Sequence, residues 1–340
     1  MTIAADACLG STTRALSATY DVAMLDLDGV VYLGSEVIDG AASGLAAARA
    51  RGMRLAYITN NASRPAGEVA AKLRSMGMPA LDDEDVVTSA QAVAHLMAEA
   101  LPAGSSVLLV GGEGLQIPLE ERGLRCVASL QDGPVAVVQG FHPDLGWHQL
   151  AEASYAIQAG LPWYVSNTDM TVPTPRGMAP GNGSLVQAVR NATGAVPIVA
   201  GKPERALFDE TIERVGGRRP LMVGDRLDTD IDGALNAGID SLAVLTGVSD
   251  LRALFAAVPG HRPTYVAADL RGLDEEHPAV VVDGAVARCA GAEVAVEGHL
   301  LQVRSGGRQD TATLRAAVEL AWSMWDRSHI SVVPDGTLVS

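Results

Sequence analysis

The sequence predicts an α/β protein with a doubly wound core of parallel strands, an inserted α/β block and a small C-terminal α+β module. Short apolar segments without polar alternation recur along the chain, as expected for strands covered on both faces. Helical segments separate most of these strands, which is typical of parallel sheets. The strands are too many for one compact sheet, so we expect the middle of the chain to form a unit of its own.

The first elements alternate between strand and helix. A short apolar strand over residues 23–28 ends in two carboxylates, and an Ala-rich helix over residues 41–52 ends at a glycine. Residues 54–59 form a second strand, and Pro65 initiates a helix that runs to Gly77. Further strands are predicted at residues 86–87, 107–110, 135–139, 163–166, 198–200, 221–223 and 241–245. Strands alternating with helices in this way predict a Rossmann-like core.

The last part of the chain has a different pattern. Residues 279–303 alternate short β-like pieces with glycine turns, and residues 311–326 form one amphipathic helix. At ~100–200 residues per domain, a chain of 340 residues is long enough for more than one domain. We expect a core of residues 20–85 and 197–265, an inserted unit of residues 86–196 and a C-terminal module of residues 270–340.

Composition and charge exclude several classes of protein. With 48% hydrophobic residues the chain can bury sizeable cores, which excludes global disorder. Its 25 basic and 40 acidic residues give a net charge of −15, which argues against nucleic acid and anionic membrane as partners. The sequence has no run of ~18 apolar residues, so no transmembrane helix is expected.

Cysteine usage and the N-terminal sequence favour a cytoplasmic protein. Cys8, Cys126 and Cys289 are odd in number and widely spaced, which argues against a disulfide framework and a zinc cluster and fits a reducing compartment. Residues 1–20 lack a basic region followed by an apolar one, so no signal peptide is expected. Whether the chain forms a homo-oligomer stays open.

Polar side chains follow four of the predicted strands. The four segments are Asp26-Leu27-Asp28-Gly29, Ile58-Thr59-Asn60-Asn61, Gly201-Lys202-Pro203 and Gly224-Asp225-Arg226-Leu227-Asp228-Thr229-Asp230. Each segment alone is a weak signal, because paired aspartates and Thr-Asn pairs are usually turn residues. In an open parallel sheet, however, ligands bind at the carboxyl ends of the strands. The four segments in this order therefore predict one site.

The side chains of this predicted site suit phosphoryl transfer. Carboxylates supply a nucleophile and oxygen ligands for Mg²⁺, and a hydroxyl and an ammonium group bind phosphoryl oxygens. The charges require a cation, since two like charges ~4 Å apart repel by about 4 kcal/mol at an effective dielectric constant of about 20. A Mg²⁺ ion, together with Lys202, reverses the repulsion that Asp26 and Asp225 exert on a phosphate dianion.

These segments resemble the motifs of the haloacid dehalogenase superfamily of phosphatases. The first motif of that superfamily, DxDx(T/V), is present as Asp26-Leu27-Asp28-Gly29-Val30. The insertion between Thr59 and Lys202 is similar to the large cap of the nitrophenylphosphatase, phosphoglycolate phosphatase and pyridoxal-phosphate phosphatase branch. Asn167-Thr168-Asp169 also looks like that branch. The resemblance covers about residues 20–260 and implies that residues 86–196 are a cap that selects the substrate.

The resemblance implies roles for the aspartates. Asp26 is expected to attack phosphorus and form an aspartyl-phosphate. Asp28 is expected to protonate the leaving group and then to serve as the base for the hydrolytic water, which favours hydrolysis over a stable phospho-enzyme. Mg²⁺ is expected to bind the side chains of Asp26 and Asp225 and the backbone carbonyl of Asp28. Asp230 is expected to orient Lys202 or a metal-bound water.

The same resemblance assigns the phosphoryl oxygens to the other two segments. Thr59, the amides of Asn60 and Asn61, and Lys202 are expected to hold them. The expected substrate is a small phosphorylated metabolite. Pyridoxal-phosphate members carry a His after the Asn-x-Asp segment, where this chain has Val172, so a small aliphatic phosphate is favoured.

Within the branch, the chain resembles bacterial glycerol-phosphate phosphatases with an extra C-terminal module. Glycerol 3-phosphate is therefore the expected substrate, with 2-phosphoglycolate or another small sugar or aryl phosphate as alternatives. Two hypotheses of other classes are a phospho-accepting signalling module and a metabolite-binding regulator with a decayed site. The intact set of motifs argues against the regulator. For residues 270–340 an acetyltransferase-like module and an interaction or stability domain both stay open.

Overall fold

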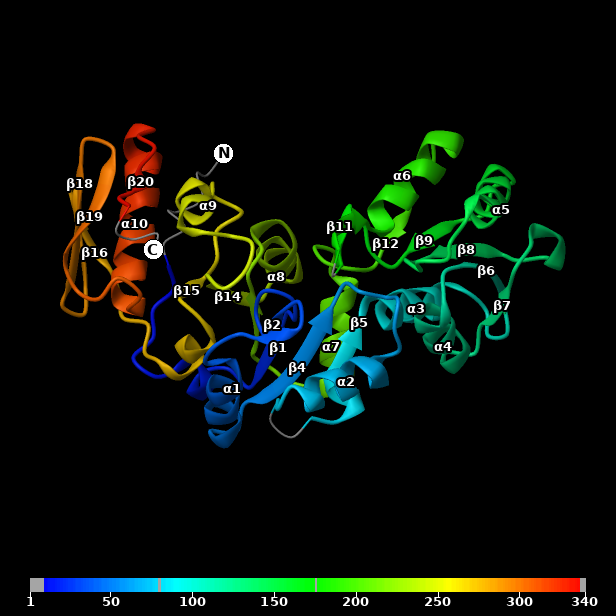
Figure 1. The fold of residues 1–340 in the computed structure, drawn as a ribbon, viewed down its shortest axis with the longest axis horizontal. Coiled ribbons are helices and arrows are strands. Elements are labelled where there is room, and N and C mark those ends of the chain that lie inside the picture. The colour runs from blue at the N-terminus through cyan, green and yellow to red at the C-terminus, as the bar shows by residue number, and fades with distance from the viewer. Residues whose placement is uncertain (1–8, 79–80, 175, 337–340) are drawn as a thin grey trace. The chain divides into compact units, whose positions relative to one another are not determined.

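The computed structural model describes residues 9–78, 81–174 and 176–336 (Figure 1). The chain divides into two compact units, and Cys8 lies outside the described residues. Unit 1 comprises the described residues within Met1–Ala56, Gly77–Pro79 and Gly217–Ser340. Unit 2 comprises those within Tyr57–Met76 and Ala80–Gly216.

The first sheet has six strands in the order β15-β14-β13-β1-β4-β5. Strand β1 pairs in parallel with β13, β13 with β14, β14 with β15, and β4 with β5. The strands are β1 (Val22–Leu25), β4 (Arg54–Thr59), β5 (Val86–Thr88), β13 (Pro220–Gly224), β14 (Asp240–Val244) and β15 (Tyr265–Ala267). The chain order runs outward in opposite directions from β1 and β13, so the ends of these two strands mark the switch point where doubly wound sheets bind ligands.

A second parallel sheet of five strands lies in unit 2, in the order β12-β9-β8-β6-β7. Its strands are β6 (Ser106–Val110), β7 (Arg125–Val127), β8 (Ala136–Gln139), β9 (Trp163–Val165) and β12 (Ile198–Val199). The hairpin β10 (Thr171–Thr174) and β11 (Gly177–Pro180) follows β9. Leu108, Val137 and Val165 of this sheet belong to one apolar cluster with residues of the helices α5 (Trp147–Gln158) and α6 (Asn182–Thr193).

Helices accompany both sheets. Those of unit 1 are α1 (Ala41–Ala50), α8 (Asp232–Ala237), α9 (Leu251–Ala256) and α10 (Thr311–Ser328), with the short turns η1 (Leu16–Ala18), η4 (Leu227–Ile231) and η5 (Leu270–Asp274). Those of unit 2 are α2 (Ala66–Ser75), α3 (Ser89–Ala100), α4 (Glu113–Glu121), α5 (Trp147–Gln158), α6 (Asn182–Thr193) and α7 (Ala206–Val215), with η2 (Asp83–Asp85) and η3 (Leu130–Asp132). Among the described helices, none is long and apolar enough to cross a membrane.

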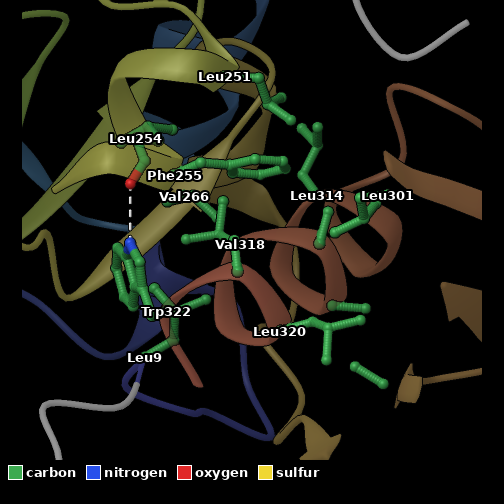
Figure 2. Packing of buried hydrophobic residues seen from close by; sticks show 14 of the residues in the cluster. Leu9, Leu251, Leu254, Phe255, Val266, Leu301, Leu314, Val318, Leu320 and Trp322 are labelled. Atoms are coloured by element: carbon green, nitrogen blue, oxygen red, sulfur yellow. Dashed lines mark hydrogen bonds between the residues drawn. The ribbon is translucent and has the colours of Figure 1, made fainter. Parts of the chain in front are cut away.

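The C-terminal module is a mixed sheet packed against α10 (Figure 1). Its strands are β16 (Val281–Asp283), β17 (Val286–Cys289), β18 (Ala292–Glu297), β19 (Leu300–Ser305) and β20 (Val333–Pro334). Strands β16 to β19 are antiparallel neighbours, and β20 joins β19 in parallel. Helix α10 also packs against β15 and α9, so its apolar side chains share one cluster with Leu254, Phe255 and Val266 (Figure 2).

The predicted α/β class, inserted parallel sheet and C-terminal α+β module are confirmed, with differences in detail. The first strand ends at Leu25 instead of residue 28. The hairpin β2 (Tyr32–Leu33) and β3 (Glu36–Val37) follows it. Strands β7, β10, β11 and β15 were not predicted, because short or proline-containing segments carry little hydrophobic pattern.

Candidate active site

Two of the predicted aspartates lie at the carboxyl ends of neighbouring strands. Asp26 follows Leu25, the last residue of β1, and its N–H donates to the carbonyl of Val223 in β13 at 3.0 Å. Asp225 follows Gly224, the last residue of β13. Because β1 and β13 are parallel neighbours, both aspartates come to the same edge of the sheet, at its switch point.

Asp230 joins these two residues, and the three are called the carboxylate cluster here. One carboxylate oxygen from each lies within 4.8 Å of the others. Asp225 and Asp230 are 1% and 0% exposed. Buried carboxylates need compensation by donors or cations, and a set of converging carboxylate oxygens is what Mg²⁺ prefers. The cluster therefore fits a hard divalent cation.

The side chain of Asp225 is fixed by the loop that follows β14. Its Oδ2 accepts the N–H of Val248 at 2.6 Å, and its backbone carbonyl accepts the N–H of Ser249 at 3.0 Å. Gly29 also lies against this carboxylate, at a φ of 91° that favours glycine. A Cβ on Gly29 would lie 2.4 Å from Asp225 Oδ2. The Thr246 hydroxyl holds this turn by donating to the Gly29 carbonyl at 2.6 Å.

The segment after β13 supplies only two of its three aspartates to the cluster. Asp230 Oδ2 accepts the N–H of Arg226 at 3.1 Å, and a Cβ on Gly224 would lie 2.2 Å from Asp230 Cβ. Asp228 instead accepts two hydrogen bonds from the Arg226 guanidinium, at 3.0 and 2.8 Å, with a side chain that is 69% exposed. These hydrogen bonds hold the pKa of Asp228 below its ordinary value. Asp228 is thus a partner of Arg226 and lies outside the carboxylate cluster.

Asp28 lies in the tight turn after β1, and it is exposed. The Leu27 carbonyl accepts the N–H of Tyr32 at 3.1 Å, and the N–H of Gly29 donates to the Tyr32 carbonyl at 2.8 Å. Two carboxylates at positions i and i+2 of a strand would point the same way, but β1 ends at Leu25, before both Asp26 and Asp28. A turn, not strand alternation, sets the direction of the second carboxylate.

In unit 2, the turn after β4 brings two donors together. The N–H of Asn61 donates to Thr59 Oγ1 at 3.1 Å. Asn61 Oδ1 accepts the N–H and the hydroxyl of Ser63, at 2.9 and 2.7 Å, which fixes the turn. In this arrangement Thr59 Oγ1 accepts the N–H of Asn61, so the hydroxyl can donate its own hydrogen to an anionic group.

Lys202 and Asn60 are joined in the same unit. The N–H of Lys202 donates to Asn60 Oδ1 at 2.8 Å, and Asn60 Nδ2 donates to the Lys202 carbonyl at 3.1 Å. Lys202 and Asn60 are 3% and 8% exposed. A Cβ on Gly201 would lie 2.6 Å from Asn60 Oδ1, so glycine is needed at this approach. The second and third predicted segments therefore meet in unit 2.

Three further residues contact Asn60, and the sequence analysis gave none of them a role. The Ser89 hydroxyl and Asn167 Nδ2 donate to the Asn60 carbonyl, at 2.5 and 2.6 Å. Asp169 Oδ1 accepts from Asn60 Nδ2 at 3.1 Å. Asn167 and Asp169 belong to the segment that resembles the nitrophenylphosphatase branch. Ser89 is the first residue of α3, and nothing in the sequence marks it as a partner of Asn60.

Family models match two parts of the chain. Residues 23–125 match the model described as haloacid dehalogenase-like hydrolase. Residues 199–273 match a second model, described as HAD-hydrolase-like. The two matches include all eight predicted site residues.

Curated relatives agree with these matches. The chain is 46% identical over 292 residues to a D-glycerol 3-phosphate phosphatase of Mycobacterium tuberculosis, covering 83% of this chain and 82% of the relative. It is 37% identical over 262 residues to an acid sugar phosphatase of Staphylococcus saprophyticus, covering 76% of this chain and 98% of the relative.

Solved structures are also similar. The glycerol phosphate phosphatase of Mycobacterium tuberculosis in complex with magnesium matches with a TM-score of 0.84 and 41% identity, covering 96% of this chain and 97% of that one. The 4-nitrophenylphosphatase of Thermotoga maritima matches with a TM-score of 0.70 and 31% identity, covering 76% and 98%. The resemblance inferred from the motifs is thereby confirmed, and the chain belongs to the haloacid dehalogenase-like hydrolases.

Proposed function

We propose that this protein is a Mg²⁺-dependent phosphatase that hydrolyses small phosphomonoesters, with glycerol 3-phosphate as the substrate. The observation that carries the proposal is the carboxylate cluster of Asp26, Asp225 and Asp230 at the switch point of the sheet. The 46% identical D-glycerol 3-phosphate phosphatase supports the choice of substrate. The acid sugar phosphatase and the 4-nitrophenylphosphatase place the chain among relatives named for phosphate esters.

In this proposal two aspartates carry the chemistry. Asp26 attacks phosphorus and forms an aspartyl-phosphate, which divides one difficult displacement into two easier ones. Asp28 gives a proton to the leaving alkoxide and takes one from the water that hydrolyses the intermediate. The position of Asp28, exposed and two residues after Asp26, supports this role.

The carboxylate cluster is the proposed binding site of Mg²⁺. Asp26 and Asp225 hold the ion by their side chains, Asp28 by its backbone carbonyl, and Asp230 orients Lys202 or a metal-bound water. The similar mycobacterial phosphatase was solved in complex with magnesium, which supports magnesium as the ion. When bound, Mg²⁺ supplies positive charge that offsets repulsion between the carboxylates and the phosphate.

The phosphoryl oxygens are assigned to unit 2. Thr59 Oγ1 and the N–H of Asn61 already lie 3.1 Å apart and offer neighbouring contacts. The backbone amide of Asn60 and the side-chain ammonium group of Lys202 complete the set of groups proposed to bind the phosphoryl oxygens.

The substrate is selected by the inserted segment in this proposal. Residues 20–85 and 197–265 are the catalytic core, residues 86–196 the cap and residues 270–340 an added module. The partner is a small phosphorylated metabolite, without nucleic acid or membrane, and the location is the cytoplasm. The net charge of −15 supports the exclusion of nucleic acid and membrane, and the widely spaced cysteines support the cytoplasm.

The proposal is tested by phosphate release from a panel of small phosphomonoesters. We expect glycerol 3-phosphate to have the highest kcat/KM, above 2-phosphoglycolate, sugar phosphates and p-nitrophenyl phosphate. Activity should disappear with a chelator, return with Mg²⁺ and be abolished in Asp26→Asn. A long-lived phosphoprotein without turnover would instead indicate a signalling module, and turnover that survives Asp26→Asn would remove the covalent mechanism.

A further inference from the structure

Asn60 is the centre of a buried polar network that joins three distant segments of unit 2. Its partners are Ser89, the Asn167–Asp169 loop after β9, and Lys202. The Asn167 carbonyl in turn accepts from Asn182 Nδ2 at 2.7 Å, at the start of α6. Such networks fix the geometry of their members when the hydrogen bonds are made. The inserted segment is therefore tied directly to the turn that carries Thr59 and Asn61.

The loop that supplies Asn167 and Asp169 is itself closely held. The N–H of Gly183 donates to the Asp169 carbonyl at 2.8 Å, and a Cβ on Gly183 would lie 2.1 Å from the Thr168 carbonyl oxygen. The N–H of Asp169 donates to Asn167 Oδ1 at 3.1 Å. Backbone packed this closely against backbone leaves little freedom, so the loop presents its two side chains in a fixed position.

Asp169 and the Lys202 backbone favour the same orientation of the Asn60 side-chain amide. Asn60 Nδ2 meets two oxygens, Asp169 Oδ1 and the Lys202 carbonyl, each at 3.1 Å. A carbonyl and an ionised carboxylate can only accept hydrogen bonds, so both require the NH₂ end of the amide. The oxygen end is then left facing the N–H of Lys202 at 2.8 Å. The Asn60 side-chain amide thus hydrogen-bonds to both the carbonyl and the N–H of Lys202, in the orientation that Asp169 also favours.

Asn167 acts on the other end of the same residue. Together with Ser89 it holds the Asn60 carbonyl, at 2.6 and 2.5 Å. In a trans peptide the C=O and the following N–H point in opposite directions. Holding the Asn60 carbonyl therefore turns the N–H of Asn61 the other way, where it meets Thr59 Oγ1 at 3.1 Å.

We propose that Asp169 and Asn167 are positioning residues that act through Asn60, Asp169 on the backbone of Lys202 and Asn167 on the N–H of Asn61. This inference rests on the proposed function, because it takes Lys202 and Asn61 as the groups that bind the phosphoryl oxygens. A displacement of about 1 Å in such a group can lower a rate by about a hundredfold. The inserted segment thus sets phosphate binding as well as substrate choice.

The test is a double-mutant cycle between Asp169 and Lys202. We expect Asp169→Ala to lower kcat/KM for p-nitrophenyl phosphate about ten- to a hundredfold in the wild-type background. In the Lys202→Ala background the same change should have little effect, because a positioning residue has nothing left to position. Asp169→Asn keeps an acceptor oxygen for Asn60 and should restore most of the loss. A merely structural role would lower the melting temperature and reduce activity in both backgrounds.

Asp144→Asn is the matched control, because it removes one negative charge from an exposed site, 89% exposed, in the same inserted segment. It should leave kcat/KM unchanged. Undiminished activity in Asp169→Ala, or equal losses in both backgrounds, would overturn the inference.

Binding of inorganic phosphate, measured by calorimetry, separates this outcome from failure of the proposed function. If the wild type hydrolyses no phosphomonoester, the proposed function fails. Weaker phosphate binding in Asp169→Ala, absent in the Lys202→Ala background, would still support the positioning role, and unchanged phosphate binding would reject it.

Discussion

The backbone of Gly247 passes Asp225 so closely that a Cβ on Gly247 would lie 1.9 Å from Asp225 Oδ2. The next residue, Val248, donates its N–H to that same oxygen at 2.6 Å. Space, not a special backbone angle, is what requires glycine here. The loop after β14 thus holds a carboxylate that we propose as a Mg²⁺ ligand, although the loop carries no ligand itself.

We expect Gly247→Ala to weaken Mg²⁺ binding about ten- to a hundredfold, because support behind a metal ligand is typically worth that much. The measurement is the Mg²⁺ concentration that gives half-maximal phosphatase activity, together with direct titration of the metal. Gly336→Ala is the control, since a Cβ there meets nothing within 4 Å. Unchanged Mg²⁺ dependence in Gly247→Ala would show that the loop can move away without cost.

The proposed acid–base role of Asp28 predicts a dependence on the leaving group. We expect Asp28→Asn to lower kcat for glycerol 3-phosphate about 10²- to 10⁴-fold. With p-nitrophenyl phosphate the leaving group is a stable anion and needs no proton, so the first step should survive. A burst of about one p-nitrophenol per enzyme, followed by slow turnover, should then appear in rapid-mixing experiments. Equal losses for both substrates without a burst would contradict the role.

Much of the site could be predicted because its residues lie at strand ends. The apolar strand before Asp26 and the one before Asp225 were both visible in the sequence, and parallel packing brings their ends to one edge. Thr59 ends β4 of the same sheet, whereas Lys202 follows β12, a strand of the second sheet, so the packing of one parallel sheet does not account for its position. Asp230 was expected to act on Lys202 or a water, and the structure places its carboxylate with those of Asp26 and Asp225.

The supporting contacts could not be predicted, since they join residues far apart in the chain. The hydrogen bond from Ser89 to the Asn60 carbonyl links residues 29 positions apart, and Asp169 is 109 positions from Asn60. The contact between Gly247 and Asp225 could not be predicted either, because the sequence does not indicate which side chain packs against a loop glycine. Residue types at strand ends predict which groups carry the chemistry, but tertiary packing decides which other residues contact and position those groups.

Because His277 is buried, we expect the free energy of unfolding to fall in acid. His277 is 0% exposed, with Nε2 2.9 Å from the Gly272 carbonyl and Nδ1 3.4 Å from Arg315 Nη1. The carbonyl only accepts, so Nε2 carries the hydrogen and Nδ1 faces the arginine unprotonated. Burial, and then the charge of Arg315, lower the pKa of His277 from 6.5 to about 4.

The unfolded chain therefore takes up a proton at His277 below about pH 6.5, whereas the folded chain does so only near pH 4. The free energy of unfolding should fall by about 3 kcal/mol as the pH is lowered through this window. His277→Gln keeps a donor for Gly272 but does not titrate, so its unfolding free energy should lose that part of the pH dependence. Urea titrations at about pH 7 and about pH 4.5 measure the difference. An identical pH dependence in both proteins would contradict the assignment.

The contacts of Trp322 lead us to expect that the C-terminal module shares one cooperative core with the rest of unit 1. Its ring is 2% exposed, and its Nε1 donates to the Leu254 carbonyl in α9 at 2.7 Å (Figure 2). The guanidinium carbon of Arg262 lies 4.7 Å from the ring centroid, in a cation–π contact. Removing such a buried aromatic side chain typically costs about 3–5 kcal/mol, so we expect Trp322→Ala to lower the free energy of unfolding by that amount.

The matched control for this prediction is Trp147→Ala, whose side chain is on the surface with an exposed fraction of 71%. It should change the free energy of unfolding by less than about 0.5 kcal/mol. Urea unfolding followed by circular dichroism and by phosphatase activity distinguishes the two arrangements of unit 1. A shared core requires the activity of Trp322→Ala to disappear in the same transition as the structure of α10. An independent module would instead unfold first and leave phosphatase activity intact, because the strands that carry Asp26 and Asp225 would then keep a complete core without it.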